Sequence, residues 1–142
     1  MNFDSSRRSF LAGGLALPAL PALAAPQQRK PIGMAQRTLG KTGLKVSPLG
    51  FGGRGTSEAG VLRRAFDLGV NYYDTGRTYP NSERLIGVAL KDHRKDVIFA
   101  TKTSAATKEK ALEDLDVSLK ELQTDYIDIW QYRSEKDRKS VV

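Results

Sequence analysis

The stretch Asp96-Val97-Ile98-Phe99-Ala100-Thr101-Lys102 decides the fold, because it is an almost unbroken apolar run that ends in a lysine. The apolar residues from Val97 to Ala100 predict a strand buried on both faces, as in a parallel sheet covered by helices. Similar strands are expected at 49–52, 70–74 and 126–131. Helical spacing of apolar residues predicts helices between them, at 57–68, from 82 onward and at 107–122. Strands that alternate with helices indicate an α/β protein with a parallel sheet and helical crossovers.

The flanking residues predict where these elements begin and end. Ser57 is expected to cap the first helix, and Gly69 is expected to end it. Ahead of this helix, residues 37–46 form two short alternating runs around a glycine-bounded turn, which predicts a β-hairpin. The helix at 107–122 carries an apolar stripe that is expected to face the core: Ala111, Leu112, Leu115, Leu119 and Leu122.

Residues 1–24 resemble a twin-arginine signal peptide and are set apart from the fold. Arg7 and Arg8 come directly before an apolar run interrupted by glycines and prolines, and Ala22-Leu23-Ala24 forms a small-x-small cleavage site. The run is too short and too broken for a stable membrane span, which needs about 20 apolar residues. A general secretory signal fits less well, since it does not need the paired arginines. The resemblance implies export by the bacterial twin-arginine route to the periplasm.

The remaining boundaries follow from composition. Residues 25–36 are polar, contain prolines and predict a linker. One domain is expected over 37–133, followed by a polar tail over 134–142.

The overall composition excludes several classes of function. The chain has 142 residues, a net charge of +7, no cysteine and one histidine, His93. Its basic residues alternate with acidic ones, as on solvated helix faces, so we expect no nucleic-acid partner. The lack of cysteine excludes disulfides and thiolate metal sites, and one histidine does not make a zinc site. We therefore expect no metal, and we interpret His93 as a solvated residue near a helix end.

A parallel sheet can be open or closed, and one set of residues favours the open form. Gly50, Gly52 and Gly55 match the G-x-G-x-x-G pattern directly before a helix, and Asp74 follows 19 residues after Gly55. A Rossmann dehydrogenase places such an acid about 20 residues on, where it binds ribose. Against this, Pro48 interrupts the preceding strand, and central parallel strands avoid proline. The open-sheet dehydrogenase is therefore kept as an alternative.

A closed barrel is favoured by Asp74, Tyr79 and Lys102, which fall at or just after the C-terminal ends of strands. Parallel sheets place their chemistry at this end. Reduction of a carbonyl needs a hydride at carbon and a proton at oxygen. A tyrosine can give the proton if a nearby Lys⁺ stabilises its phenolate, and an aspartate can hold that ammonium in place. The simpler interpretation is an Asp–Lys salt bridge beside a rim tyrosine.

Several motifs together resemble the aldo-keto reductase family. They are Asp74-Thr75, the five-residue step to Tyr79, the run Asn81-Ser82-Glu83 and the later Thr101-Lys102. The similar stretches extend from about residue 37 to residue 131. The resemblance implies a TIM (β/α)8 barrel closed at the bottom by the hairpin, and an oxidoreductase that uses NADPH to reduce aldehydes or ketones.

The same resemblance implies roles for single residues. Tyr79 would donate the proton, Lys102 would tune it, and Asp74 would anchor Lys102. Gly52 and Gly53, together with Asp74, would lie near the nicotinamide of the cofactor. The glycine pattern before the first helix is then a coincidence of the first barrel strand.

Two departures from the family pattern bear on activity. Arg133 stands where the family usually places a histidine, just after the fourth strand. An arginine can donate hydrogen bonds to a carbonyl oxygen but stays charged, so we expect altered or impaired reduction. The second departure is length. A (β/α)8 barrel needs about 250 residues, and residues 37–133 hold the hairpin and about the first four β-α units.

Two hypotheses follow from this short length. The first is an exported reductase truncated to the N-terminal half of its barrel, of reduced activity alone, with a small carbonyl compound as substrate. The second is a non-enzymatic half-barrel that self-associates through the exposed edges of its sheet.

Overall fold

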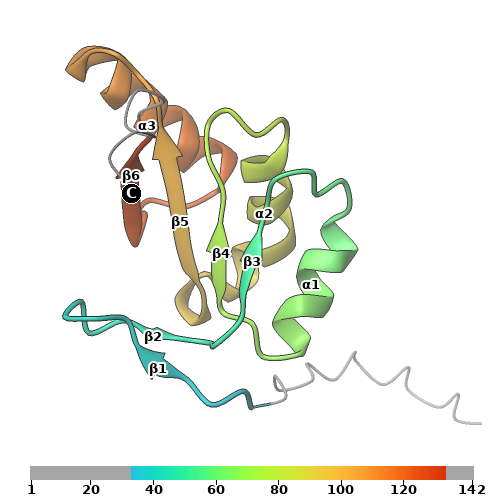
Figure 1. Ribbon diagram of the computed structural model, residues 1–142. Coiled ribbons are helices and arrows are strands. Elements are labelled where there is room, and N and C mark those ends of the chain that lie inside the picture. The colour runs from blue at the N-terminus through green and yellow to red at the C-terminus, as the bar shows by residue number, and fades with distance from the viewer. Residues whose placement is uncertain (1–32, 134–142) are drawn as a thin grey trace, which may run out of the picture.

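The computed structural model describes residues 33–133. The expected signal peptide at 1–24, most of the expected linker at 25–36 and the expected tail at 134–142 lie outside the described residues. Within them, a small hairpin lies at one end of a four-stranded sheet, and helices pack against one face of that sheet (Figure 1).

The predicted hairpin is present. Strands β1 (Arg37–Thr38) and β2 (Lys45–Val46) pair antiparallel. Glycines open and close the turn between them with positive φ angles, 52° at Gly40 and 78° at Gly43. Glycine reaches this region at no steric cost, which is why the turn can be this tight.

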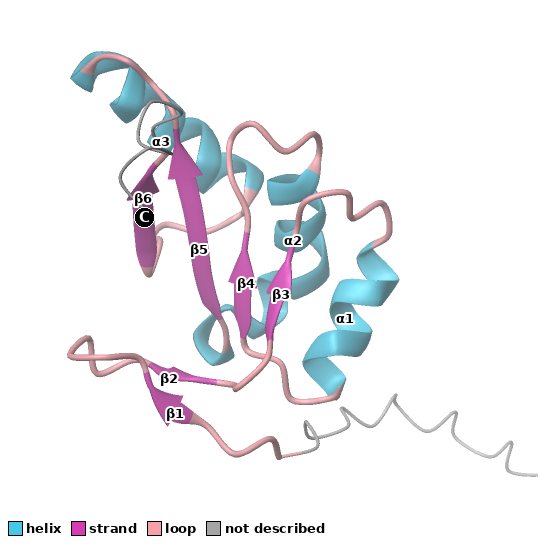
Figure 2. Cartoon of the chain, in the orientation of Figure 1, coloured by secondary structure: helices cyan, strands magenta, loops and turns pink. Residues whose placement is uncertain are grey.

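The larger sheet is parallel throughout. Its strands are β3 (Gly50–Gly52), β4 (Tyr72–Asp74), β5 (Ile98–Thr103) and β6 (Ile129–Tyr132). The connections contain α1 (Ala59–Asp67), α2 (Ser82–Leu90), the 3-10 helix η1 (Lys91–Asp96) and α3 (Lys108–Glu121) (Figure 2).

Strand order separates the closed form from the open one. The strands lie side by side in chain order, β3-β4-β5-β6, and each pairs in parallel with the next. A doubly wound sheet reverses its order at a switch point, whereas a (β/α)8 barrel continues in one direction. The structure therefore has the topology of a barrel segment, and the Rossmann alternative is wrong.

One face of the sheet packs against the helices and forms the core. Tyr73 and Phe99 are both 0% exposed and lie in one cluster with Leu62 and Phe66 of α1. The rings of Phe51 and Tyr73 stack with centroids 5.9 Å apart. Burial, and secondarily the charge of Asp67, raises the pKa of the Tyr73 phenol. This face supplies most of the apolar burial.

The opposite face, which we call the inner face, carries the neighbouring residues of the same strands. Gly52, Asp74 and Ala100 share one row across β3, β4 and β5, and Lys102 lies two residues further along β5. Side chains alternate between faces along a strand, so Asp74 and Lys102 point away from the helix-packed core. At the C-terminal ends of the strands the inner face thus combines small residues with charged ones, whereas the row before it holds Tyr72 and Ile98.

Two details of the helices differ from the prediction. Ser57 does not cap α1, because the N-cap residue is Glu58, which makes no side-chain capping bond. The apolar stripe of α3 is only partly buried: Leu122 is 0% exposed, but Leu112 is 48% exposed. The buried residue within α3 is a serine, Ser118. Gly69, by contrast, ends α1 as predicted, with a φ of 93°.

Candidate active site

Asp74 and Lys102 form an ion pair at the C-terminal ends of β4 and β5. The Lys102 Nζ donates to both carboxylate oxygens of Asp74, at 2.9 and 2.8 Å, and to the Thr75 carbonyl oxygen at 2.6 Å. An ammonium has three protons, and these acceptors engage all of them. The lysine is therefore held in one orientation. The structure brings together the two charged residues that the sequence proposed as partners.

Tyr79 joins this pair from the loop after β4. The Lys102 Nζ lies 5.3 Å from the centroid of the Tyr79 ring, which is within cation–π range. Among the described residues, the lysine makes no hydrogen bond to the phenol oxygen. The guanidinium carbon of Arg54 lies 5.9 Å from the same centroid. The Tyr79 ring is therefore close to two positive charges.

Short contacts to β5 set the position of the Tyr79 loop. The Thr75 N–H donates to the Ala100 carbonyl at 2.8 Å, and the Arg77 N–H donates to the Lys102 carbonyl at 3.0 Å. Between them, a Cβ on Gly76 would come within 2.8 Å of the Lys102 side chain. Only glycine allows this approach, so the step from Asp74 to Tyr79 is fixed by backbone pairing with β5.

Glu83 is a buried carboxylate behind the site; the sequence analysis named it only as part of the Asn81-Ser82-Glu83 run and gave it no role. It is 3% exposed and accepts hydrogen bonds from the hydroxyls of Thr101 and Ser118, both at 2.7 Å. It also forms an ion pair with Arg77, in the loop that carries Tyr79. One side chain thus connects that loop with β5 and α3. The sequence signal was Ser118, a polar residue among the apolar positions of α3.

The glycines proposed to lie near the cofactor have different surroundings. Gly52 is exposed at the end of β3, and a Cβ there would meet nothing within 4 Å. Gly53 is buried, donates its N–H to the Asp74 carbonyl at 2.7 Å, and would place a Cβ 2.3 Å from the Ser82 hydroxyl. A flat ring can approach the backbone at Gly52, while Gly53 fits only a scaffold role toward α2. The residues present therefore fit the reacting ring of a nicotinamide beside Asp74.

Arg133 directly follows β6 and lines the same cavity as Tyr79. Its N–H donates to the Thr103 carbonyl at 2.8 Å, which continues the pairing of β6 with β5. A cavity of about 220 Å³ contains both side chains, and its lining residues are Arg54, Thr78, Tyr79, Ser104 and Arg133. Every lining residue carries a polar group, and none is acidic.

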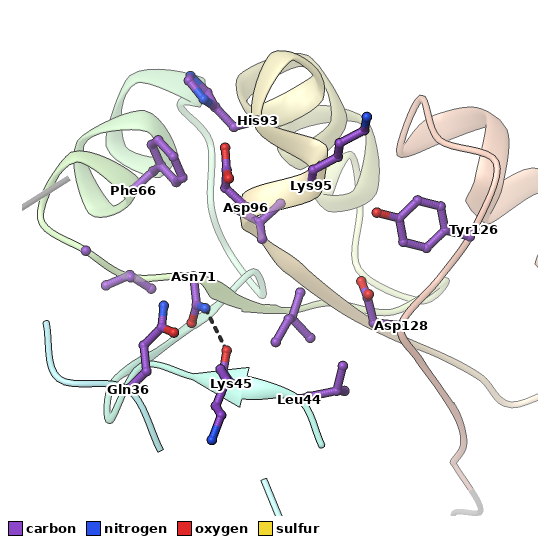
Figure 3. Close-up of a pocket in the computed structure, with 14 residues that line it drawn as sticks. Gln36, Leu44, Lys45, Phe66, Asn71, His93, Lys95, Asp96, Tyr126 and Asp128 are labelled. Carbon is purple, nitrogen blue, oxygen red and sulfur yellow. Dashed lines mark hydrogen bonds between the residues drawn. The ribbon is translucent and has the colours of Figure 1, made fainter. Parts of the chain in front are cut away.

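A larger cavity of about 720 Å³ lies at the other end of the sheet (Figure 3). It lies between the hairpin residues Leu44 and Lys45 and the beginning of β5, with the Asn71 amide donating to the Lys45 carbonyl at 2.8 Å. Lys102 lies near the opposite end of β5, so this cavity is separate from the candidate site. His93 also lines it; it is half-buried in η1 and stacks on Phe66 with ring centroids 4.3 Å apart, so it is only partly exposed to solvent.

Two properties of the described residues bear on the expected partners. No group of three or more histidine, cysteine, aspartate or glutamate side chains within residues 33–133 could hold a metal ion. Over the same residues, every helix is too short or too polar to cross a membrane.

Comparison with known proteins gives consistent matches. The pattern of the Aldo/keto reductase family matches residues 54–134. L-galactose dehydrogenase from Arabidopsis thaliana is 37% identical over 114 residues, which is 66% of this chain and 36% of that protein. Aldo-keto reductase YhdN from Bacillus subtilis is 33% identical over 123 residues, covering 69% of this chain and 37% of that protein.

A solved structure agrees with these matches. The holo form of aldo-keto reductase AKR11C1 from Bacillus halodurans superposes with a TM-score of 0.63 and 34% identity, covering 75% of this chain and 43% of that one. The chain thus spans between 36% and 43% of the length of these relatives.

Proposed function

This chain belongs to the aldo/keto reductase family, and from that premise we propose that it carries the proton-donating part of a site for NADPH-dependent reduction of small aldehydes or ketones. The single observation that supports this most is the Asp74–Lys102 ion pair beside the Tyr79 ring. The three residues come from different segments, and backbone pairing holds them at one edge of the sheet.

Each side chain has one task in the proposed reaction. Tyr79 donates its phenolic proton to the carbonyl oxygen while the carbonyl carbon receives a hydride, which gives an alcohol. Lys102 stabilises the phenolate that remains, because its positive charge is held beside the ring. Asp74 holds Lys102 in its orientation, and water returns a proton to Tyr79 after the alcohol leaves.

The fourth position is filled differently from the usual family pattern. Arg133 can donate hydrogen bonds to the carbonyl oxygen and polarise it, but it cannot change protonation state near neutral pH. Among the described residues that line the cavity, Tyr79 is then the group that we expect to give the proton. We expect slower reduction than with a histidine at this position, and a rate that depends on Tyr79 alone for the proton.

The cofactor contacts on this chain concern its reacting end. Gly52 leaves the backbone open to a flat ring, Asp74 and Lys102 flank that opening, and Gly53 fixes the strand end beneath it. A reduced nicotinamide bound there supplies the hydride. We propose NADPH as the donor, as the family resemblance implies.

The test is turnover of the purified chain with NADPH and a generic aldehyde. Tyr79→Phe keeps the ring and removes the proton, so the rate should fall by about 100-fold or more. Tyr132→Phe is the matched control, because Tyr132 is 65% exposed and lies outside the cavity, and it should leave the rate unchanged. Equal rates for Tyr79→Phe and the parent chain would show that Tyr79 is not the proton donor.

A second candidate function is self-association without catalysis. The observation in its favour is on β6, where Trp130 is 40% exposed and Tyr132 is 65% exposed beside an edge that pairs on one side only within residues 33–133. Exposed aromatic residues at a sheet edge favour contact with another chain. Sedimentation should then show a concentration-dependent oligomer that Tyr132→Lys disrupts. A monomer at all concentrations would count against this function.

We also propose that residues 1–24 direct export by the twin-arginine route. A reporter protein fused behind residues 1–36 should reach the bacterial periplasm. Changing both Arg7 and Arg8 to lysine should stop it, while Arg29→Lys, outside the signal, should not. Export that survives loss of both arginines would contradict the assignment.

A further inference from the structure

The cavity beside Tyr79 has an unusual charge balance. Two of its lining residues, Arg54 and Arg133, are arginines, and the others contribute hydroxyl groups. Within residues 33–133, neither arginine forms an ion pair. The nearby Lys102 is balanced by Asp74, and Arg77 by Glu83. The two cavity arginines therefore carry positive charge that no described carboxylate offsets.

This arrangement favours an anion inside the cavity. A guanidinium offers several N–H donors in a planar fork that matches a carboxylate, and such charge-assisted hydrogen bonds are roughly twice as strong as neutral ones. The hydroxyls of Thr78 and Ser104 can donate to the same group. At about 220 Å³ the cavity is below the roughly 300–1,000 Å³ typical of sites for drug-sized ligands, so a compact molecule fits best.

We propose that the substrates are small anionic carbonyl compounds, that is oxo acids whose carboxylate binds Arg54 and Arg133 while the carbonyl oxygen faces Tyr79. This inference rests on the proposed function and adds the substrate class. Arg133 then has a second role besides polarisation, since it places the carbonyl by holding the other end of the molecule. Tyr79, Arg54 and Arg133 line the same cavity, and the Arg54 guanidinium lies 5.9 Å from the centroid of the Tyr79 ring, so one short molecule can contact all three residues.

The same charges could instead bind a phosphate group of the cofactor, and the experiment separates the two sources. Levulinate and its methyl ester are a matched pair, because the ester removes the charge and leaves the ketone intact. The parent chain should prefer the acid in kcat/KM by about tenfold or more, the usual size of one charged hydrogen bond. Arg54→Gln and Arg133→Gln should each reduce this preference about tenfold.

Arg64→Gln is the matched control, since Arg64 is an exposed arginine of α1 outside the cavity. It removes the same charge and should leave the preference unchanged. Equal use of acid and ester, or a preference that the cavity variants do not alter, overturns the proposal. It is also overturned if those variants weaken NADPH binding while the acid preference persists.

A binding measurement keeps this proposal distinct from the proposed function. Valerate has the carboxylate without the ketone, so calorimetry can follow its binding without turnover. If neither levulinate nor its ester is reduced, the proposed function fails. Valerate binding that Arg54→Gln and Arg133→Gln abolish still supports an anion site, and absence of valerate binding by the parent chain overturns it.

Discussion

The two faces of the parallel sheet differ in what their side chains do. On the helix-packed face, Tyr73 and Phe99 are completely buried and stack or pack against other apolar groups. On the inner face, Asp74 and Lys102 are partly exposed and make polar contacts at the strand ends. The residues of the two faces alternate along the same short strands, so each strand serves the core and the site at once.

Residues that stabilise the core and residues of the candidate site are therefore adjacent in the chain, with their side chains on opposite faces of the sheet. Tyr73 on the helix-packed face is followed directly by Asp74 on the inner face. In the same way, Thr101 donates a hydrogen bond to Glu83 on the helix-packed face, and the next residue, Lys102, donates to Asp74 on the inner face. A shift of one residue in strand register would exchange the two sets. Substitutions on the helix-packed face should therefore change the free energy of unfolding most, and those on the inner face least.

The largest effect is expected at the centre of the helix-packed face. Phe99→Ala should lower the free energy of unfolding by about 3–5 kcal/mol, because it leaves a cavity where a 0% exposed ring now packs. Tyr132→Ala, at a 65% exposed position, should cost less than about 1 kcal/mol. Both residues lie on the helix-packed face by strand register, so urea denaturation followed by circular dichroism compares a buried with an exposed position of that face. Similar losses at the two positions would show that the burial of Phe99 does not support the fold.

The next effect concerns Glu83. Glu83→Gln leaves Arg77 without its carboxylate partner, and Arg77 is 26% exposed, so solvent screens part of the loss. We expect the free energy of unfolding to fall by about 2–3 kcal/mol. The control is Glu113→Gln, which breaks the exposed pair with Lys110 and should have no measurable effect. Equal denaturation midpoints for both variants would show that the Glu83 cluster does not support the fold.

Alkaline pH tests the same face through Tyr73. Burial raises the pKa of its phenol, so the unfolded chain loses this proton first and stability should fall above about pH 10. Tyr73→Phe loses the bonds to the Leu62 and Val70 carbonyls and should cost about 1 kcal/mol at neutral pH. Because the variant has no phenol at this position, its free energy of unfolding should fall less steeply than that of the parent chain between about pH 9 and pH 11. Parallel pH curves for variant and parent would exclude Tyr73 as the cause.

The smallest effect is expected on the inner face. Lys102→Met breaks the pair with Asp74, whose side chain is 35% exposed, so water can solvate the remaining carboxylate. The free energy of unfolding should change by less than about 1 kcal/mol. The same urea assay measures it, and a loss as large as that of Glu83→Gln would show that the ion pair is mainly structural.

Much of the fold could be predicted from local patterns. The apolar run at Val97 to Ala100 predicted β5, and alternation of strands and helices predicted a parallel sheet, because these periods directly reflect burial. The glycine-bounded turn predicted the hairpin. Choosing between open and closed forms needed the family resemblance, since the glycine pattern before α1 also fitted a Rossmann fold.

The remaining features depend on contacts between distant segments. Glu83 could be taken for an ordinary acidic residue in the first turn of α2, yet Ser118 lies 35 residues away and bonds it. The partial exposure of the α3 stripe depends on which neighbours cover the helix, and no local period reports this. Local sequence patterns also do not predict the cavity lined by Arg54, Tyr79 and Arg133, because these residues lie on three separate segments of the chain.

The order of the strands also governs how the chain can assemble. Each strand of the larger sheet pairs with the strand nearest to it in sequence, so most pairings close short stretches of chain. Contacts between near neighbours in sequence favour fast folding, and chains begin to fold from the N-terminus during synthesis. The sheet can therefore grow at one edge while the ribosome is still adding residues. Among the buried residues of the core, Leu122, whose backbone packs against Gly87 of α2, would be the last to be synthesised.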